Sequence, residues 1–399
     1  IRLNHLIKVA MKQTERYRVM KLAGNSREEI DQAFRTPRDM KVFSYAGIVD
    51  TVMTPMDSLL YHKSFLRTGF MAMDPKTGAV KAYVGGPSFP FFQYDMVSTG
   101  RRQIGSTVKP FLYTYAMEEG FTPCDMFSNT QPVITDEAGN VWMPRNASRA
   151  RVGEMVNLRW ALTNSNNWIS ARLISELSPT ELVRHMHNFG INSRLDPVMS
   201  LALGPCDVSV QEMVSAYTAF ANKGMRAAPM YVTAIADAQG NIISEFTPRY
   251  TEVISEKAYY KILSMLMNVV SGGTGSRVRR APYNITAEMG GKTGTTNYNA
   301  DGWFMGFTPE LVAGTWVGGD ERYIHFNTMA YGQGAAMALP IYGLFMKKVY
   351  GDKSLPYSQS TKFEFPADID LCEKEYFGEE DLSDADNNAT ETSIEGIFD

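Results

Sequence analysis

A serine and a lysine three residues apart, Ser106 and Lys109, carry the clearest chemistry in this sequence. The apolar run from Phe111 to Met117 follows them and predicts a helix that begins at the serine. Residues three apart lie on one face of a helix, so the hydroxyl and the ammonium are expected side by side. A seryl hydroxyl becomes a good nucleophile when a neighbour takes its proton, and a buried lysine readily loses its charge. The pair indicates Ser106 as a nucleophile and Lys109 as its base, although this spacing alone arises by chance about once or twice in a chain of this length.

A second group, Ser165-Asn166-Asn167, lies in or beside a predicted helix over 154–175. Ser165 can relay a proton, and Asn167 can hold a substrate amide. Taken alone, these residues are more typical of a helix cap. They point to catalysis only in combination with the other motifs.

The third group, Lys292-Thr293-Gly294-Thr295, stands in a run that predicts a strand. Alternate residues of a strand project to the same side, so Thr293 and Thr295 can hold one carboxylate while Lys292 supplies positive charge. Gly294 leaves room for a substrate backbone against the strand edge. Backbone N–H groups here and at Ser106 can stabilise the oxyanion of a tetrahedral intermediate.

A second Lys-Thr-Gly occurs at Lys76-Thr77-Gly78. It follows Pro75 and separates two predicted strands, 69–73 and 79–84, so we assign it to the turn of a β-hairpin. The copy at Lys292 runs on into a strand and is assigned to chemistry.

The motifs Ser-x-x-Lys, Ser-x-Asn and Lys-Thr-Gly follow one another in the order that is the signature of penicillin-binding proteins and class A β-lactamases. The chain resembles the transpeptidase half of a class A, bifunctional penicillin-binding protein. Further similar stretches are 69–86, 203–222, 301–309 and 315–319, and the likeness extends over most of the chain.

The resemblance implies an α+β, β-lactamase/transpeptidase-like fold. This is a mainly antiparallel five-stranded sheet sandwiched by helices, with a large helical subdomain inserted between strands 2 and 3. The pattern agrees, because strands at both ends with a helical block between them predict one sheet built from non-contiguous pieces. The transpeptidase domain is expected over residues 67–350.

Two flanking regions are expected. Residues 1–66 are predicted to be a linker that precedes the catalytic domain. We expect it to be the remnant after a glycosyltransferase module that this chain lacks, and to contain too few apolar residues to bury a core of its own. Residues 351–399 read as an acidic, mobile extension. Residues 367–399 carry a net charge of −11, which leaves +7 for the 366 residues before them.

The resemblance also implies a role for each motif residue. Ser106 is the acylated nucleophile and Lys109 its base. Ser165 and Lys292 form the proton-relay and electrostatic pair. The remaining four residues bind the donor peptide, and they are Asn167, Thr293, Gly294 and Thr295.

The reaction implied is peptidoglycan D,D-transpeptidation. The serine attacks a D-Ala-D-Ala stem peptide, the last D-Ala leaves, and the acyl group passes to an amine on a neighbouring strand. β-Lactam antibiotics would acylate the same serine. One departure from the family pattern is Ile104, which stands where proline usually precedes the glycine of the first motif; it alters the turn but should spare the chemistry.

Other readings remain. A class A β-lactamase shares the motifs, but it needs a deacylating glutamate that we do not find after Ser165. A carboxypeptidase differs only in using water as the acceptor. A third possibility is a β-lactam sensor or cell-wall scaffold that is acylated without turnover.

Composition adds few constraints. The sequence has three widely spaced cysteines, which argues against a disulfide framework or a zinc site. The pair His185 and His187 is assigned to a polar helix face, and no metal or cofactor is expected. No basic run with interleaved aromatic residues suggests nucleic-acid binding. The longest apolar stretch, 335–346, is interrupted by Pro340 and is too short to span a membrane.

The expected partners are peptidoglycan stem peptides, β-lactams and other cell-wall synthesis proteins. The resemblance implies a site of action on the periplasmic, extracytoplasmic face of the bacterial inner membrane, with a membrane anchor in the full-length protein that this chain lacks.

Overall fold

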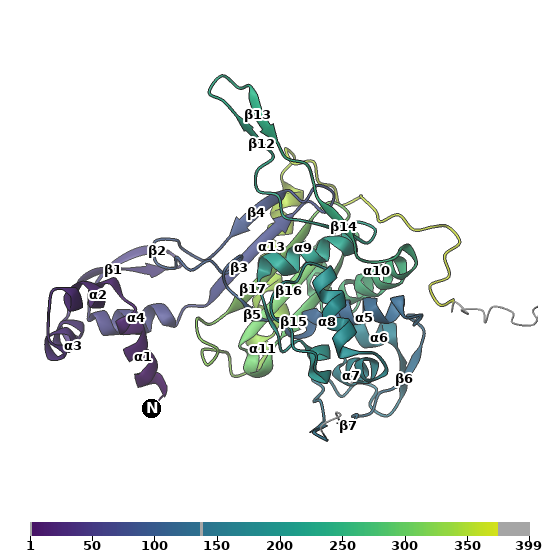
Figure 1. Cartoon of the computed structure of the whole chain (residues 1–399), viewed down its shortest axis with the longest axis horizontal. Helices are drawn as coiled ribbons and strands as arrows, with labels where there is room; N and C mark the ends of the chain where they lie inside the picture. Colours follow the sequence, from purple (N-terminus) through teal and green to yellow (C-terminus); the bar gives the residue numbers. More distant parts are fainter. Residues whose placement is uncertain (1, 136–138, 374–399) are drawn as a thin grey trace, which may run out of the picture.

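The computed structural model describes residues 2–135 and 139–373. Its centre is a five-stranded sheet with the strand order β15-β16-β17-β3-β4, in which every neighbouring pair is antiparallel (Figure 1). The strands are β3 (Arg67–Met73), β4 (Val80–Val84), β15 (Gly290–Thr295), β16 (Asp301–Phe307) and β17 (Val312–Gly318). Along the chain, the second and third strands of this sheet are β4 and β15. About half of the chain separates them, as expected for an inserted helical subdomain. The predicted fold is confirmed.

Helices cover both faces of the sheet. One face packs against α9 (Val210–Ala221) and α10 (Glu256–Ser271), and the other against α12 (Gly334–Met337) and α13 (Leu339–Gly351). Each face has its own cluster of buried apolar side chains. Trp303 and Trp316 lie on neighbouring strands, are fully buried, and belong to the cluster on the side of α9 and α10. Burial of this apolar surface is the main force that holds the layers together.

The inserted subdomain, residues 85–289, carries the first two sequence motifs. Its helices are α5 (Lys109–Glu118), α6 (Leu158–Thr163), α7 (Asn167–Glu176) and α8 (Pro179–Asn188), together with α9 and α10. The short α11 (Met329–Gly332) follows the last strand of the sheet. The short strands of the subdomain form pairs: β5 (Arg102–Gln103) with β10 (Asp207–Val208), β6 (Met126–Ser128) with β9 (Met155–Asn157), β7 (Ile134–Thr135) with β8 (Val141–Trp142), and β11 (Met225–Ala227) with β14 (Tyr250–Glu252). The hairpin of β12 (Ala234–Ala236) and β13 (Ile242–Glu245) projects from the body (Figure 1). The cap of α9 is Ser209, with Glu212 completing a capping box.

The N-terminal module, residues 2–66, is more than a linker. It consists of α1 (Arg2–Lys12), α2 (Glu15–Leu22), α3 (Arg27–Arg35), the hairpin of β1 (Arg38–Ser44) and β2 (Gly47–Met53), and α4 (Pro55–Lys63). Ser26 and Glu29 form the capping box that their spacing predicts. Met11, Ile30 and Phe34 are buried together, so the expectation that this segment has no core of its own was wrong. The sequence signal was weak because Met11 of α1 meets Ile30 and Phe34 of α3, about 20 residues further along the chain.

The first part of the C-terminal extension also differs from expectation. Residues 352–373, here the C-terminal strap, lie against the catalytic body instead of extending freely. Gln359 accepts a hydrogen bond from the backbone N–H of Thr286 at 2.7 Å, and the backbone N–H of Phe363 donates to Glu288 at 2.9 Å. The ring of Phe363 is buried beside Phe307. Residues 374–399 lie outside the described part of the chain.

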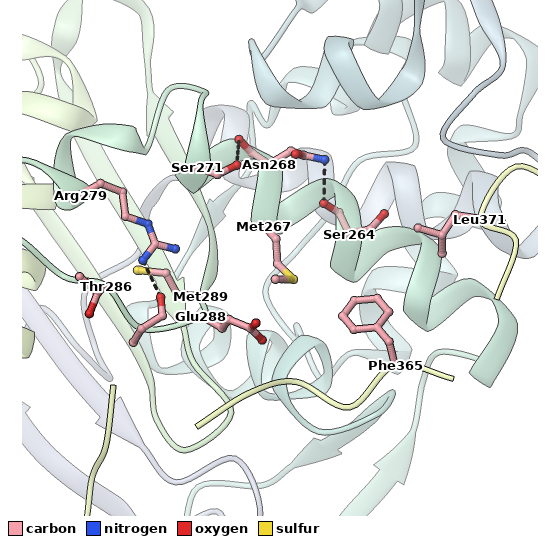
Figure 2. Close-up of a pocket in the computed structure, with 11 residues that line it drawn as sticks. Ser264, Met267, Asn268, Ser271, Arg279, Thr286, Glu288, Met289, Phe365 and Leu371 are labelled. Carbon is pink, nitrogen blue, oxygen red and sulfur yellow. Dashed lines mark hydrogen bonds between the residues drawn. The ribbon is translucent and has the colours of Figure 1, made fainter. Parts of the chain in front are cut away.

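A pocket lies between the strap, α10 and the segment that leads into β15 (Figure 2). Phe365 and Leu371 of the strap close one side, and Met267 and Asn268 of α10 face them. On the opposite side, Arg279 donates a hydrogen bond to the carbonyl of Ala287 at 2.5 Å. The strap thus completes the packing behind the strand that carries Lys292.

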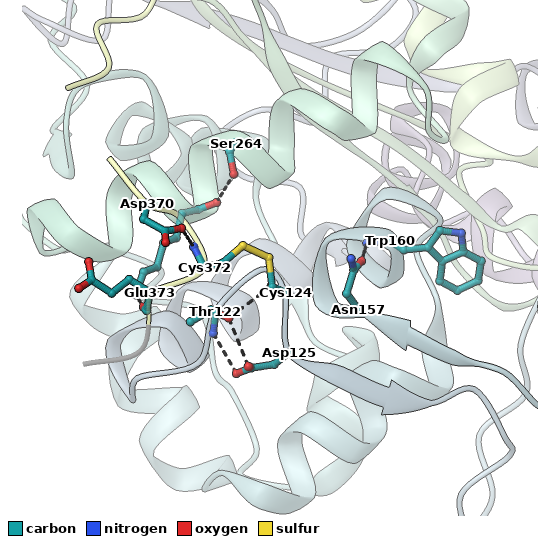
Figure 3. The surroundings of a disulfide bond; sticks show 10 residues. Thr122, Cys124, Asp125, Asn157, Trp160, Ser264, Asp370, Cys372 and Glu373 are labelled. Atoms are coloured by element: carbon teal, nitrogen blue, oxygen red, sulfur yellow. Dashed lines mark hydrogen bonds between the residues drawn. A yellow bond between two sulfur atoms is a disulfide. The ribbon is translucent and has the colours of Figure 1, made fainter. Parts of the chain in front are cut away.

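A disulfide fixes the end of the strap. Cys372 is bonded to Cys124, which lies just after α5, and the two Cα atoms are 5.5 Å apart (Figure 3). The argument from spacing against disulfide bonding was therefore wrong for Cys124 and Cys372. The third, Cys206, is free and buried, and burial raises the pKa of its thiol to about 12.

No helix in the described ranges is long and apolar enough to cross a membrane.

Candidate active site

Ser106 lies in a tight 3₁₀ turn, Gly105–Val108, that runs directly into α5. Gly105 has φ +52°, and a Cβ on it would approach the carbonyl oxygen of Thr295 to 2.9 Å, so a glycine is required on both counts. The backbone N–H of Gly105 donates to the carbonyl of Gly204 at 3.0 Å. The close contact between Gly105 and Thr295 sets the turn against the end of β15. Ile104, which precedes the turn, is fully buried.

Lys109, the first residue of α5, is fully buried. Its Nζ donates to the carbonyl oxygen of Ser165 at 2.7 Å and to Oδ1 of Asn167 at 2.7 Å, with Oγ of Ser165 3.4 Å away. Burial, and then the nearby charge of Lys292, hold the pKa of Lys109 well below its usual range. The lowered pKa makes the neutral, proton-accepting form of Lys109 more available.

Ser165 stands in the turn between α6 and α7 with φ 54°, a backbone conformation that is costly for serine. Asn166 fixes this turn, because its side chain caps α7 by accepting from the backbone N–H of Ile169 at 3.0 Å. A non-glycine residue held at positive φ is a common sign of a functional position. The cap reading of this motif is correct for Asn166, while Ser165 points at the two lysines.

Lys292, on β15, is also fully buried. Its Nζ donates to Oγ of Ser165 at 2.8 Å and to the carbonyl of Thr293 at 2.9 Å. Burial lowers the pKa of Lys292 to about 7. Neither lysine amine has a carboxylate among its hydrogen-bond partners in the described structure, so the site favours their neutral forms.

A small cleft of about 190 Å³ opens over this group. Ser106, Asn167 and Thr295, which come from three separate motifs, all line it, and Lys109, Ser165 and Lys292 are linked beneath them. The other lining residues are Gln103, Gly105, Trp142, Ser200, Leu203, Pro205, Thr296 and Asn297. The fold therefore brings the three motifs to one place.

The two threonines of the third motif have different surroundings. Thr295 accepts a hydrogen bond from the backbone N–H of Gly334 at 2.9 Å, which leaves its own hydroxyl proton available to a ligand in the cleft. Thr293 is buried and donates to the hydroxyl of Thr274 at 2.8 Å. A Cβ on Gly294 would come within 2.7 Å of the carbonyl of Ile104, so this glycine permits close packing of β15 on the serine turn.

The second Lys-Thr-Gly is a turn, as predicted. Gly78 has φ +74°, the backbone N–H of Asp74 donates to the carbonyl of Ala79 at 3.0 Å, and Lys76 is exposed.

Sequence reasoning missed several contributors. Thr274 follows two glycines, and that run of small residues was the only available signal; its N–H donates to the carbonyl of Thr163 at 3.2 Å, which seats it next to Thr293. Trp142, at the end of β8, and Ser200, in the 3₁₀ helix Met199–Leu203, line the cleft from segments that carry no motif.

Comparisons with known proteins agree with this geometry. The family model described as "Penicillin binding protein transpeptidase domain" matches residues 68–319, and the one described as "Penicillin-binding protein middle domain" matches residues 2–66. The chain is similar to "Penicillin-binding protein 2D" of Bacillus subtilis, with 34% identity over 65% of this chain and 38% of that protein. It is also similar to "Penicillin-binding protein 1A" of Aquifex aeolicus, with 33% identity over 71% of this chain and 38% of that protein. The chain thus spans under two fifths of the length of these relatives.

Solved structures give the same result. The crystal structure of Penicillin-Binding Protein 1A from Haemophilus influenzae aligns with a TM-score of 0.68 and 25% identity, over 77% of this chain and 51% of that one. The structure of PonA1 from Mycobacterium tuberculosis aligns with a TM-score of 0.64 and 21% identity, over 83% of this chain and 86% of that one, and shows the shared fold. The resemblance seen in the sequence is confirmed, and the N-terminal module expected as a linker corresponds to the family's middle domain. The chain belongs to the penicillin-binding protein transpeptidase family.

Proposed function

We propose that the chain catalyses D,D-transpeptidation of peptidoglycan stem peptides through an acyl-enzyme on Ser106. The observation that carries the proposal is the position of Oγ of Ser165, within 2.8 Å of the Nζ of Lys292 and 3.4 Å of the Nζ of Lys109. A hydroxyl between two buried amines can pass a proton from one to the other, which both half-reactions need.

In acylation, neutral Lys109 takes the proton of the Ser106 hydroxyl as Oγ attacks the carbonyl carbon of the penultimate D-Ala. Backbone N–H groups of Ser106 and Thr295 stabilise the oxyanion, a contribution of about 2.7–4 kcal/mol for each donor. The peptide C–N bond then breaks, and the proton passes through Ser165 to the departing amine of the last D-Ala.

In deacylation, an amine from a second stem peptide attacks the seryl ester and loses its proton to Lys109, which is neutral again. The new amide forms, and the proton returns to Oγ of Ser106. A β-lactam differs because its ring opens on attack and no fragment departs. The structure of PonA1 in complex with penicillin V, a fold relative of this chain, supports β-lactams as ligands.

Substrate recognition is assigned to the third motif and to Asn167. Thr295 offers a hydroxyl proton to the terminal carboxylate, Thr293 completes that subsite from a buried position, and Gly294 lets β15 pack against the serine turn so that the peptide can lie along this strand. Asn167 lines the cleft wall and is assigned to the donor peptide, while its Oδ1 accepts from Lys109 and its Nδ2 donates to the carbonyl of Arg145 at 2.7 Å.

The proposed location is the extracytoplasmic side of the bacterial inner membrane, with stem peptides and other cell-wall synthesis proteins as partners. The disulfide between Cys124 and Cys372 supports an oxidising compartment, because such bonds are rare in reducing cytosol.

The test is turnover of a synthetic pentapeptide ending in D-Ala-D-Ala, with and without an added acceptor amine, followed by mass spectrometry. Transpeptidation predicts release of D-Ala together with an amine-linked product, and loss of both in Ser106→Ala. Release of D-Ala with only the hydrolysed tetrapeptide would identify a carboxypeptidase. Acylation by penicillin followed by its rapid hydrolysis would identify a β-lactamase, and acylation without D-Ala release would identify a sensor or scaffold.

A further inference from the structure

Asp301 is a buried carboxylate at the start of β16 that no catalytic step above uses. Its Oδ1 accepts from Nε of Arg102 at 2.7 Å and from Nε1 of Trp316 at 3.0 Å, and its Oδ2 accepts from Oγ1 of Thr296 at 3.0 Å. These three donors come from β5, β17 and the turn that follows β15. One carboxylate therefore joins two neighbouring parts of the central sheet to β5, which is 199 residues away in the sequence.

The link to Arg102 reaches the serine turn. Arg102 and Gln103 form β5, which leads directly into Ile104, Gly105 and Ser106. The carbonyl of Gln103 accepts from Nε1 of Trp303 at 2.8 Å, so β5 is attached to β16 twice. On its other side β5 pairs with β10. The place of the Ser106 backbone relative to the sheet is set by these bonds.

The link to Thr296 reaches the end of β15. The hydroxyl of Thr296 donates to Asp301 and also accepts from the backbone N–H of Asp301 at 3.0 Å, while the backbone N–H of Thr296 donates to the carbonyl of Asp301 at 3.1 Å. Thr296 is buried and adjoins Thr295, whose backbone lies against Gly105. The turn from 296 to 301 is thereby closed on the same carboxylate that holds Arg102.

We propose that Asp301 is a positioning residue which, through Arg102 and Thr296, fixes the spacing of the Ser106 and Thr295 backbone N–H groups as an oxyanion hole. This role rests on the proposed function. Stabilisation of an oxyanion depends steeply on donor placement, and a misplacement of about 1 Å can lower a rate by about a hundredfold. Binding of the ligand in its ground state depends far less on the placement of these donors.

The test uses Thr296→Val, which removes the hydroxyl while leaving the buried ion pair of Arg102 and Asp301 in place. The matched control is Thr315→Val: within the described structure Oγ1 of Thr315 is buried without a hydrogen-bond partner, in the neighbouring strand β17. Stopped-flow acylation with a fluorescent penicillin separates the initial binding constant from the acylation rate constant. Thr296→Val should lower the acylation rate constant about ten- to a hundredfold with less than about a threefold change in binding, whereas Thr315→Val stays at the wild-type values.

Two further variants keep the result decisive. Thr296→Ser retains the hydroxyl and should restore the acylation rate constant to within about threefold of wild type. Asp301→Asn keeps the shape of the side chain but weakens both links, so it should show the same selective loss and serves if Thr296→Val does not fold. Wild-type acylation rates in Thr296→Val, or equal losses in Thr296→Ser and Thr296→Val, would overturn the role while leaving Ser106 acylation intact. A wild-type protein that is never acylated on Ser106 would refute the proposed function and this role together.

Discussion

Oγ of Ser165 lies 2.8 Å from Nζ of Lys292, so a serine from the helical subdomain meets a lysine from the central sheet 127 residues further along the chain. This contact joins two sequence motifs across the boundary between the two parts of the domain. It also places a single hydroxyl where it can exchange protons with two amines, since Lys109 approaches it from α5.

The first prediction concerns that hydroxyl. Ser165→Gly should reduce acylation by penicillin about 10²–10⁴-fold, because the proton relay is lost. Its stability should stay at or slightly above wild type, because glycine adopts φ 54° without strain. Rapid-quench labelling and thermal unfolding measure the two effects. Ser165→Ala is the matched variant, with an equal loss of rate but lower stability; a rate within about threefold of wild type in both variants would remove Ser165 from the mechanism.

The pH dependence follows from the lowered lysine pKa values. Ser165 relays a proton between Lys109 and Lys292, so the acylation rate should rise with pH through about 7 as Lys292 becomes neutral, and level off above it; the pKa of the base Lys109 is lowered as well. An unperturbed lysine would place this rise near pH 10. Acylation rates measured between pH 5.5 and 9 separate the two cases, and a rate that is still rising tenfold per pH unit at pH 9 would contradict a lowered pKa.

Lys292→Met should make the protein more stable at neutral pH while abolishing acylation. Between pH 7 and 10.5 the unfolded chain binds a proton at Lys292 that the folded protein does not, so folding stability is lost as pH falls through this range. Methionine removes this cost, and after the loss of two hydrogen bonds we expect a net gain of about 2 kcal/mol at pH 7. Chemical denaturation at pH 7 and pH 9.5 is the measurement. The gain should shrink at the higher pH, and a destabilised variant at both pH values would show that the lysine is charged in the fold.

The disulfide of the C-terminal strap gives a fourth prediction. Cys124 and Cys372 are 248 residues apart, and a bond that closes so long a loop stabilises the folded state mainly by restricting the unfolded one, by about 2–4 kcal/mol. Reduction should lower the unfolding temperature of the wild-type protein. The variant with Cys124→Ala and Cys372→Ala should already unfold at the lower temperature and ignore the reductant. Cys206 is free and remains in both proteins. If the reductant also lowers the unfolding temperature of the variant, the effect does not come from the disulfide.

Gly105→Ala should damage both stability and acylation. Its φ of +52° disfavours alanine, and the added Cβ would press on the carbonyl of Thr295 at 2.9 Å. We expect a loss of about 1–3 kcal/mol and at least a tenfold lower acylation rate. Gly272→Ala is the control, because nothing lies within 4 Å of its added Cβ. Equal acylation rates in the two variants would show that the serine turn tolerates displacement.

Local patterns predicted the elements of this fold well. The capping box at Ser26, the turn at Gly78 and the strand that carries Lys292 all follow from residues close together in the sequence. The motifs also predicted which residues meet at the cleft. Spacing could not predict what each group bonds to: Lys109 was expected beside the Ser106 hydroxyl, but its described hydrogen bonds go to Ser165 and Asn167.

The features that sequence reasoning missed all depend on contacts between distant segments. Arg102 and Asp301 are 199 residues apart, and Cys124 and Cys372 are further apart still. Cysteine spacing does not reveal pairing, and a buried aspartate looks like any surface aspartate until its neighbours are known. The extension that begins with the strap was expected to be mobile because it is acidic and has few apolar residues, yet Phe363, the hydrogen bonds of the strap and the disulfide hold residues 352–373 on the domain.

The most direct test of the account is to incubate the protein with a penicillin, measure its intact mass, and map the modified peptide. We predict one added penicillin, stable over the experiment, on the peptide that contains Ser106, and no addition in Ser106→Ala. An unmodified protein, or a penicillin attached equally to Ser106→Ala, would contradict the assignment of Ser106 as the nucleophile of this site.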